Sequence, residues 1–386
     1  MKKNISIFLI VVIIVTVIWL YFIPSSVILK NGKVNTEKAD LSEIKTRKLI
    51  GQMFIIGFRG TSVNENSYII RTIKDLNIGG IILFDYDIPS GIKERNIINP
   101  TQTKKLVSDI VSYSETPLLI SIDAEGGMVN RLKPAYGFSD IPSHEMLGKE
   151  QKKKTHRTAE ILGKELSELG INLNFAPVVD LNTNPQNPII GKLERSFSDN
   201  PNLVVIHASE FISGLHDFNI LTSIKHFPGH GSSNTDSHLG IVDITKTYKN
   251  KELEPFRTLI EKKLVDTVMV AHVFNKNIDQ DYPASLSEKF IQNILREELG
   301  FDGVVISDDM DMGAIRNNYG FEDAVVKAVK AGTNMLIISN NGNVYDESSP
   351  KRAIDAIWNA IQTGDVSISN IYTSAEKIRV LKEKIK

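Results

Sequence analysis

Eight short apolar runs, separated by longer segments of helical periodicity, are the feature that most restricts the fold of this chain. The runs occupy residues 53–58, 79–84, 117–123, 173–180, 220–224, 267–272, 303–308 and 335–339. Near-continuous apolar character over such short runs is typical of strands buried on both faces, as in parallel sheets. Amphipathic segments such as 155–169, 202–218, 287–299 and 321–331 lie between the runs. The alternation predicts an α/β fold with parallel strands.

Polar residues at the ends of these runs favour one parallel architecture over the other. They are Asp123, Asp180, Lys225-His226, His272, Asp308-Asp309 and Asn340-Asn341. An open doubly wound sheet also fits the alternation, but the carboxyl ends of the strands are where (β/α)8 barrels assemble catalytic sites. We therefore predict a single catalytic (β/α)8 TIM-type barrel over residues 41–386.

The N-terminus carries a separate hydrophobic segment. Residues 5–23 are uncharged, and at about 1.5 Å per residue they form roughly 28 Å of helix. We predict an N-terminal transmembrane anchor over residues 1–23 and a polar tether over 24–40. A cleaved signal peptide is the alternative, but bulky residues such as Trp19 and Tyr21 stand where cleavage needs small ones.

The charges beside this segment predict its orientation. Lys2 and Lys3 precede the apolar run and are expected to stay in the cytoplasm. The barrel then lies on the other side, so we predict a single-pass protein of the cell membrane with an extracytoplasmic catalytic domain. If the segment is cleaved, the protein is secreted.

Composition excludes several other partners. The 45 basic and 46 acidic residues give a net charge of −1, which provides no electrostatic case for binding nucleic acid. The absence of cysteine excludes disulfides and thiolate metal sites. We expect a monomer with no nucleic-acid partner and a membrane contact through the N-terminal helix.

The stretch from Lys225 to His238 gathers three of the eight histidines together with a lysine and an aspartate. Ionisable groups at the end of a buried strand are costly to place there for packing alone. Within the stretch, Asp236 lies two residues before His238, and a carboxylate can hold and polarise a histidine that acts as general acid and base. The alternative is a surface histidine beside an Asx turn.

A zinc site is a further alternative for the same stretch, because His226, His230 and His238 follow one another closely. The spacing of four between the first two brings imidazoles together on a helix. Pro228-Gly229 forbids a helix between them, so any such site is built from a loop. We regard His230 as structural and predict no metal and no cofactor.

Asp308 and Asp309 end the seventh run. Because successive strand side chains point to opposite faces, only one of them can easily face the barrel axis. Such a carboxylate can act as nucleophile, base or metal ligand, whereas Asp309 or Asp311 can also cap the next helix. Residues 123–131, after the third run, combine Asp123 with Arg131 and suit a ligand rich in hydroxyl groups.

These motifs resemble glycoside hydrolase family 3, and in particular its single-domain β-N-acetylglucosaminidases. The resemblance rests on Lys225-His226-Phe227-Pro228-Gly229-His230-Gly231, Asp236-Ser237-His238 and Ser307-Asp308-Asp309-Met310, with 123–131, 177–180, 187–197, 269–273, 283–287, 299–308 and 367–379 in the same order. It covers about residue 42 to the end and implies a (β/α)8 barrel.

The resemblance also implies a retaining double displacement and assigns its residues. Asp308 would be the nucleophile that forms a covalent glycosyl-enzyme, and His238 the acid/base in a dyad with Asp236. The sugar hydroxyls would be bound by Asp123, Arg195, Lys225 and His226, with Arg131 in support. The implied activity is an exo-β-N-acetylglucosaminidase acting on terminal residues of cell-wall-type or other glycans, with a role in peptidoglycan turnover.

One departure concerns Arg195, because Lys192-Leu193-Glu194 precede it where the family usually has a single residue. That insertion makes the position of Arg195 the least secure. A family 3 β-glucosidase, a phosphorylase, a metal-dependent hydrolase and a non-catalytic membrane-tethered glycan-binding protein are alternatives to the leading hypothesis.

Overall fold

The computed structural model describes residues 34–235, 240, 242–342 and 344–385, with side chains described from Ser42 onwards. The chain divides into two compact units, Met1–Lys45 and Thr46–Lys386. Among the described residues, no helix combines the length and the apolar character that crossing a bilayer requires. The anchor predicted over residues 1–23 lies outside them.

A closed barrel of eight parallel strands forms the centre of the second unit. The strands are β1 (Phe54–Gly57), β2 (Gly80–Leu83), β5 (Leu119–Ile122), β8 (Leu173–Asn174), β9 (Leu221–Phe227), β11 (Thr267–Val270), β13 (Val304–Asp309) and β14 (Met335–Ile338). Strand β14 pairs with β1 and closes the ring, in the order β1-β14-β13-β11-β9-β8-β5-β2. Each strand lies within one of the eight apolar runs except at its margins, so the predicted barrel is confirmed.

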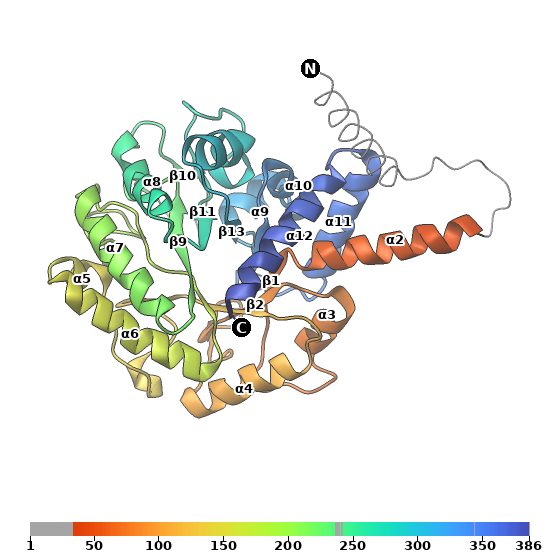
Figure 1. The fold of residues 1–386 in the computed structure, drawn as a ribbon, viewed down its shortest axis with the longest axis horizontal. Helices are drawn as coiled ribbons and strands as arrows, with labels where there is room; N and C mark the ends of the chain where they lie inside the picture. The colour runs from red at the N-terminus through yellow and green to blue at the C-terminus, as the bar shows by residue number, and fades with distance from the viewer. Residues whose placement is uncertain (1–33, 236–239, 241, 343, 386) are drawn as a thin grey trace, which may run out of the picture. The chain divides into compact units, whose positions relative to one another are not determined.

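Helices surround these strands (Figure 1). They are α3 (Tyr68–Leu76), α4 (Pro100–Ser112), α5 (His144–Gly148), α6 (Lys152–Leu169), α7 (Pro201–His216), α8 (Glu254–Glu261), α9 (Gly313–Tyr319), α10 (Phe321–Ala331), α11 (Ser349–Thr363) and α12 (Ile368–Lys382). A π-helix spans Lys289–Glu298, and α2 spans Val34–Gly51. Because α2 begins at Val34, the last part of the segment predicted as a tether is helical.

Short elements decorate the loops between strands and helices. They are the hairpins β3 (Tyr86–Asp87) with β4 (Ile92–Lys93) and β6 (Ala124–Gly126) with β7 (Val129–Asn130), and the parallel pair β10 (Val242–Asp243) with β12 (Val273–Phe274). The 3-10 helices are Pro134–Tyr136, Asn250–Leu253, Ala284–Leu286 and Glu383–Ile385. The peptide bonds Ala176–Pro177, Lys225–His226 and Phe227–Pro228 are cis.

The fourth strand is much shorter than its apolar run. Strand β8 ends at Asn174, and Pro177 follows after two residues. Proline has no N–H to donate to a neighbouring strand, so regular pairing stops before it. Val178 restores a single bridge to Lys225, which brings the segment after β8 back beside β9.

Both faces of the sheet are buried, as a parallel barrel requires. The strands β1, β2, β5, β9, β11 and β14 are buried along their whole length, and one continuous apolar cluster joins the barrel to the helices. Strand β13 differs, because Asp308 and Asp309 at its carboxyl end are only partly buried. The closed barrel is therefore buried along its strands except at the carboxyl end of β13, where Asp308 and Asp309 are in part open to solvent.

Candidate active site

The carboxyl ends of several strands bring charged residues to one face of the barrel. Asp123 and Glu125 follow β5, Asp180 follows β8, Lys225 and His226 lie in β9, and Asp308 and Asp309 end β13. In a parallel barrel all the carboxyl ends lie on the same face. This geometry places residues far apart in the sequence within hydrogen-bond distance of one another.

A buried group of four charges occupies this face. Lys225 Nζ lies 2.8 Å from Asp123 Oδ1 and 2.7 Å from Glu125 Oε1. Arg195 binds Glu125 through two parallel hydrogen bonds of 2.8 Å, from Nε and Nη2. The Lys225 side chain is 2% exposed and that of Glu125 1%, whereas 18% of the Asp123 side chain remains open to solvent. Asp123 is therefore the carboxylate of the group that a ligand can reach.

Neighbouring cations keep the carboxylates of Asp123 and Glu125 ionised. Burial would raise the pKa of the Asp123 carboxyl, but the charges of Lys225 and Arg131 outweigh it and hold the pKa below its usual value. Burial acts in the same way on Glu125, where Arg195 and then Lys225 hold the pKa of the carboxyl far below its ordinary range. The group carries fixed charges at neutral pH because opposite charges this close favour the ionised forms.

Arg195 reaches this group despite the residues inserted before it. Gly191 accepts a hydrogen bond from the Glu194 amide at 3.0 Å, and Glu194 has a φ of 56°, so Lys192-Leu193-Glu194 form a tight turn. After the turn, the Arg195 amide donates to the Ile190 carbonyl at 3.1 Å. The insertion is therefore absorbed locally, and Arg195 stands beside Glu125 and His226.

His226 is held at both ring nitrogens. Nδ1 lies 2.6 Å from Asp180 Oδ2, and Nε2 lies 3.2 Å from Arg195 Nη2. Because a guanidinium can only donate, Nε2 acts as the acceptor and Nδ1 carries the proton toward Asp180. Burial would raise the pKa of Asp180, but His226 outweighs it and holds the pKa low. This arrangement leaves His226 poorly suited to the zinc site considered above.

His230 fixes the start of the loop after β9. Its backbone amide donates to Asp180 Oδ1 at 2.8 Å, and its Nδ1 lies 2.9 Å from the Ser233 hydroxyl. Burial lowers the pKa of the His230 imidazole to about 4. A buried neutral histidine whose ring is bonded to the hydroxyl of Ser233 in its own loop fits a structural role. Asp236 and His238, which follow in this loop, lie outside the described residues.

Asp308 and Asp309 have different partners. The Asp308 carboxylate accepts a hydrogen bond from the Asp309 amide at 2.8 Å, and its charge acts on His230 on the same face. Asp309 instead accepts from Ser339 and from the amide of Asp311. Neither Asp309 nor Asp311 caps the next helix, because α9 begins after Met312 without a side-chain cap. Asp311 binds Arg316 within α9 at 2.5 Å.

Arg131 lies behind Asp123. Its Nη2 is 3.7 Å from Asp123 Oδ2, and its Nη1 is 4.0 Å from the buried Asp85. Lys133 also contacts Asp85. The structure thus brings Asp123, Arg131, Arg195, Lys225 and His226 to one face, the face on which Asp308 ends β13.

Two members of the site are absent from the residues predicted to bind or react. Glu125 lies two residues after Asp123 and alternates with it after β5, and that spacing was a usable signal. From the sequence alone, Asp180 is only one of the polar residues at the ends of the strands. Its bonds to His226 and to the His230 amide show that it organises the β9 loop.

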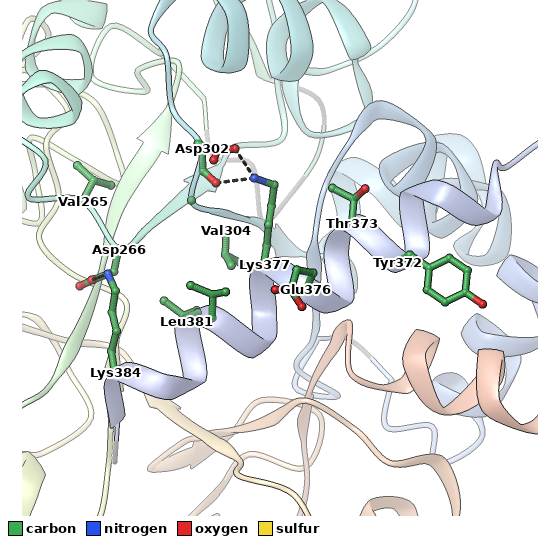
Figure 2. A pocket seen from close by; sticks show the side chains of 12 residues that line it. Val265, Asp266, Asp302, Val304, Tyr372, Thr373, Glu376, Lys377, Leu381 and Lys384 are labelled. Atoms are coloured by element: carbon green, nitrogen blue, oxygen red, sulfur yellow. Dashed lines mark hydrogen bonds and ion pairs between the residues drawn. The ribbon is translucent and has the colours of Figure 1, made fainter. Parts of the chain in front are cut away.

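Two other features of the described residues lie away from this face. A groove of about 570 Å³ runs between α12 and the amino-terminal ends of β11 and β13, where Lys384 binds Asp266 and Lys377 binds Asp302 (Figure 2). These ends of the strands are opposite to the charged face, so the groove is no part of the candidate site.

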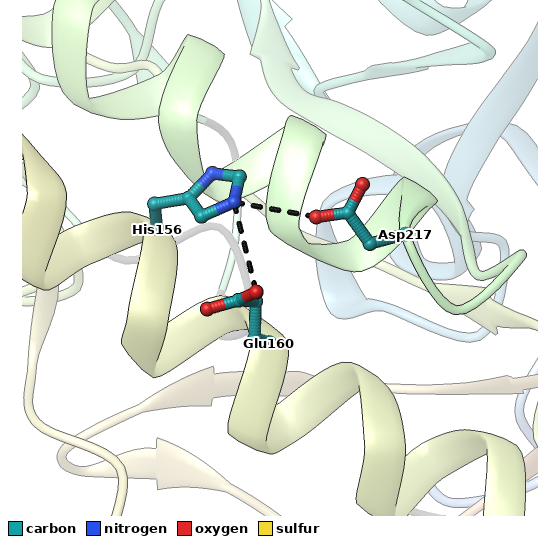
Figure 3. A group of neighbouring side chains, drawn as sticks. All are labelled: His156, Glu160 and Asp217. Carbon is teal, nitrogen blue, oxygen red and sulfur yellow. Dashed lines mark ion pairs between the residues drawn. The ribbon is translucent and has the colours of Figure 1, made fainter.

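The second feature is a group on the surface of two helices. His156 and Glu160 of α6 and Asp217 after α7 place their ligand atoms within 4.8 Å of one another (Figure 3). The arrangement could hold a metal ion, but all three side chains are open to solvent and His156 also faces Glu210 at 3.4 Å. Ion pairing between the helices accounts for it.

Comparison with known proteins gives a consistent result. The family model for the glycosyl hydrolase family 3 N terminal domain matches residues 45–381. A beta-hexosaminidase of Nitrosomonas eutropha is 34% identical over 303 residues, which are 76% of this chain and 82% of that protein. One from Tolumonas auensis is 37% identical over 275 residues, 70% of this chain and 78% of that protein.

Solved structures agree. A glycoside hydrolase family 3 beta-N-acetylglucosaminidase from Paenibacillus matches with a TM-score of 0.80 at 35% identity, covering 88% of this chain. The match spans 62% of the Paenibacillus chain, which is the longer of the two. A beta-N-acetylhexosaminidase from Beutenbergia cavernae matches with a TM-score of 0.78 at 26% identity, over 88% of this chain and 98% of that one.

Proposed function

This chain belongs to glycosyl hydrolase family 3, and we propose that it is a retaining exo-β-N-acetylglucosaminidase. The observation that carries the proposal is the buried group of Asp123, Glu125, Lys225 and Arg195 on the face where Asp308 ends β13. The named β-hexosaminidase and β-N-acetylglucosaminidase relatives support the substrate class.

The charged group suits the recognition of a neutral sugar ring. Asp123 is partly open and can accept hydrogen bonds from hydroxyl groups, while Lys225 and Arg195 supply donors beneath and beside it. Glu125 is buried and holds the two cations in place. Charges that are already paired and fixed need little reorganisation when a ligand arrives.

In the proposed mechanism, Asp308 attacks the anomeric carbon of the terminal sugar. The bond from that carbon to the leaving oxygen breaks as His238, oriented by Asp236, gives the oxygen a proton. His238 then takes a proton from a water molecule, whose oxygen attacks the anomeric carbon and releases Asp308. The same group acts first as acid and then as base, so the cycle ends with the enzyme in its starting state.

The carboxylate Asp308 must be ionised to attack. A histidine with an ordinary pKa of about 6.5 suits a group that both donates and accepts a proton near neutral pH.

The test is hydrolysis of an aryl β-N-acetylglucosaminide by the wild type and by Asp308→Ala. We expect the variant to lose turnover to the uncatalysed background while its thermal unfolding stays close to that of the wild type. Asp302→Ala is the matched control, because Asp302 is an exposed carboxylate at the opposite end of the barrel. Near-normal turnover by Asp308→Ala would falsify the assignment.

The same assay separates the alternatives. Faster turnover of an aryl β-glucoside points to a β-glucosidase, and dependence on inorganic phosphate with release of a sugar phosphate points to a phosphorylase. Loss of activity on treatment with a chelator, restored by a metal, supports a metal-dependent hydrolase. Binding of glycans without turnover by the wild type leaves the non-catalytic glycan-binding protein.

We further propose that residues 1–23 anchor the enzyme in the cell membrane with the barrel outside, where cell-wall glycans are its substrates. The uncharged run of residues 5–23 after Lys2 and Lys3 supports this topology. Fractionation of cells that express the full chain should place it in the membrane fraction, and protease should reach the barrel from outside. A soluble product that begins after residue 23 would instead identify a cleaved signal peptide.

A further inference from the structure

The two aspartates at the end of β13 are coupled through one backbone amide. Asp308 Oδ1 accepts the hydrogen bond of the Asp309 N–H at 2.8 Å. The Asp309 side chain faces the other way, where its Oδ1 accepts from the amides of Ser339 at 3.0 Å and Asp311 at 3.1 Å. The residue that orients the Asp308 carboxylate is therefore itself anchored to the next strand.

This anchoring occurs where the sheet is irregular. The register between β13 and β14 shifts between Ile306 and Asp309. A bulge of this kind re-aims the side chains that follow it, and bulges are frequent beside active sites. Pairing resumes at Asp309, which lies opposite Ile337, and side-chain contacts add to it at this point.

Contacts from two neighbouring strands fix Asp309 at this point. From β14, the Ser339 hydroxyl lies 2.5 Å from Asp309 Oδ2. From the end of β11, His272 Nε2 lies 3.0 Å from the Asp309 carbonyl oxygen. A carbonyl can only accept, so Nε2 carries the proton, and Nδ1 accepts from the Ser285 hydroxyl at 2.6 Å. Side chain and carbonyl of Asp309 are thus held from opposite sides.

We propose that Asp309 is a positioning residue for catalysis: clamped by Ser339 and His272, it presents the amide that sets the orientation of the Asp308 carboxylate. This inference rests on the proposed function, in which Asp308 is the nucleophile. A nucleophile must meet the anomeric carbon in line, and small misplacements of a reacting group are costly in rate. Asp309 acts through Asp308 and does not touch the substrate.

The protonation state of Asp309 also affects the Asp308 carboxylate. Burial raises the pKa of the Asp309 carboxyl to about 8, with repulsion from Asp311 adding and the Ser339 hydrogen bonds opposing. The titratable groups around it include Asp308 on its own strand, Asp311 with its partner Arg316, and His272. At neutral pH Asp309 is mostly uncharged, so it places no second negative charge beside Asp308.

Asparagine is the variant that isolates this role. Asp309→Asn keeps the acceptor for the two amides and places an amide N–H opposite the Ser339 hydroxyl, whose oxygen can accept from it, but it cannot ionise. Asp309→Ala removes all the side-chain contacts. Ser339→Ala removes only the hydroxyl partner, and it remains informative if Asp309→Ala fails to fold. Asp302→Asn is the control for loss of a carboxylate elsewhere.

The measurement is kcat and KM for an aryl β-N-acetylglucosaminide between pH 5 and 9. We expect Asp309→Ala to lower kcat by about ten- to a hundredfold with little change in KM, and Ser339→Ala to have a smaller effect of the same kind. Asp309→Asn should keep kcat within about threefold of the wild type at pH 7. The wild type should show an additional fall of kcat as the pH rises through about 8, beyond the loss of the His238 proton, and Asp309→Asn should lack this additional fall.

Three results would overturn the inference while the wild type remains active and Asp308→Ala remains inactive. In the first, Asp309→Ala keeps the kcat of the wild type. In the second, Asp309→Asn is as slow as Asp309→Ala. In the third, kcat of Asp309→Asn falls at alkaline pH in the same way as kcat of the wild type. An inactive wild type would instead remove the proposed function itself. The two failures are therefore distinguishable.

Discussion

Two of the described groups that combine a histidine with carboxylates differ strongly in burial. At the charged face of the barrel, His226 contacts Asp180 at 2.6 Å, and the two side chains are 7% and 0% exposed. On the surface of α6 and α7, His156 contacts Asp217 at 3.2 Å, and these side chains are 28% and 50% exposed. The residue types are the same, but only the first group is removed from water.

The comparison shows how burial changes the energetics of the same residue types. Exposed ion pairs contribute about 0–1 kcal/mol because water and salt screen them. Buried charges carry a large desolvation penalty that only a full set of partners offsets, so removal of one partner is costly. The barrel face should therefore be sensitive to single substitutions, and the helix surface tolerant of them.

The largest effect is expected from Lys225→Met. The substitution leaves the carboxylates of Asp123 and Glu125 without their shared cation, and we expect a loss of about 3–5 kcal/mol in the free energy of unfolding. Urea denaturation at pH 7 measures it. Lys105→Met, which removes an exposed lysine paired with Asp109, is the control and should change stability by less than about 0.5 kcal/mol. Equal losses in the two variants would contradict the comparison.

The next largest effect is expected from acid, which should destabilise the fold through its buried histidines. Burial lowers the pKa of His144 and the pKa of His230 to about 4 each. The ring of His144 stacks on that of Phe197, with 4.1 Å between the ring centroids. The unfolded chain takes up these protons as the pH falls through about 6.5, whereas the folded protein does so only near pH 4. Stability is therefore full above pH 6.5 and declines by up to about 3 kcal/mol per histidine on the way to pH 4.

His144→Phe tests this pH dependence. The variant should show a shallower decline of the unfolding free energy between pH 6.5 and 4 than the wild type, whatever its stability at pH 7. Denaturant titrations at four or five pH values across this range give the slope. An unchanged slope would mean that His144 is not the neutral buried group described above.

A smaller effect is expected from Asp180→Asn. The amide can still accept from the backbone of His226 and His230, but the charge opposite the His226 ring is gone. We expect a loss of about 1–3 kcal/mol at pH 7. Because the pKa of Asp180 is lowered in the folded state, its contribution is present above the unfolded pKa of about 3.9 and lost as the pH falls through the folded value. The gap between variant and wild type should thus narrow in acid.

The smallest effect is expected from His156→Ala. The loss should stay below about 1 kcal/mol at low salt and shrink further when salt is added, because the ion pairs to Asp217 and Glu210 are open to solvent. Thermal unfolding at two ionic strengths measures it. A loss as large as that of Asp180→Asn would show that the helix surface behaves like the barrel face.

Much of the fold could be predicted because its signal is local. Each of the eight apolar runs contains one strand, and the helices α6, α7 and α10 lie within about three residues of the segments with helical periodicity. Pro177 was the visible reason why β8 stops early, since proline cannot extend a ladder. The polar strand ends favoured the barrel over an open sheet, because a closed ring of strands brings all its carboxyl ends together around one opening, whereas an open sheet spreads them along an edge.

Part of the site could also be predicted. Asp123, Lys225 and His226 stand at strand ends and could be recognised by position. Alternation indicates that only one of Asp308 and Asp309 faces the barrel axis, and the choice of Asp308 as nucleophile came from the family resemblance. The predicted acid/base pair Asp236 and His238 stays a prediction, as does the membrane anchor over residues 1–23. Both lie outside the described residues.

The sequence by itself determined which segments become strands and helices, and it marked the strand ends as the place for chemistry. Only the tertiary structure decided the partners, such as Arg195 with Glu125 seventy positions away, or Lys225 with Asp123 across 102 positions. Only the tertiary structure also decided that His226 is buried at the barrel face while His156 is partly exposed on the surface of α6. Hydrophobic periodicity is a property of neighbouring residues, whereas pairing and burial depend on distances between segments that the chain brings together on folding.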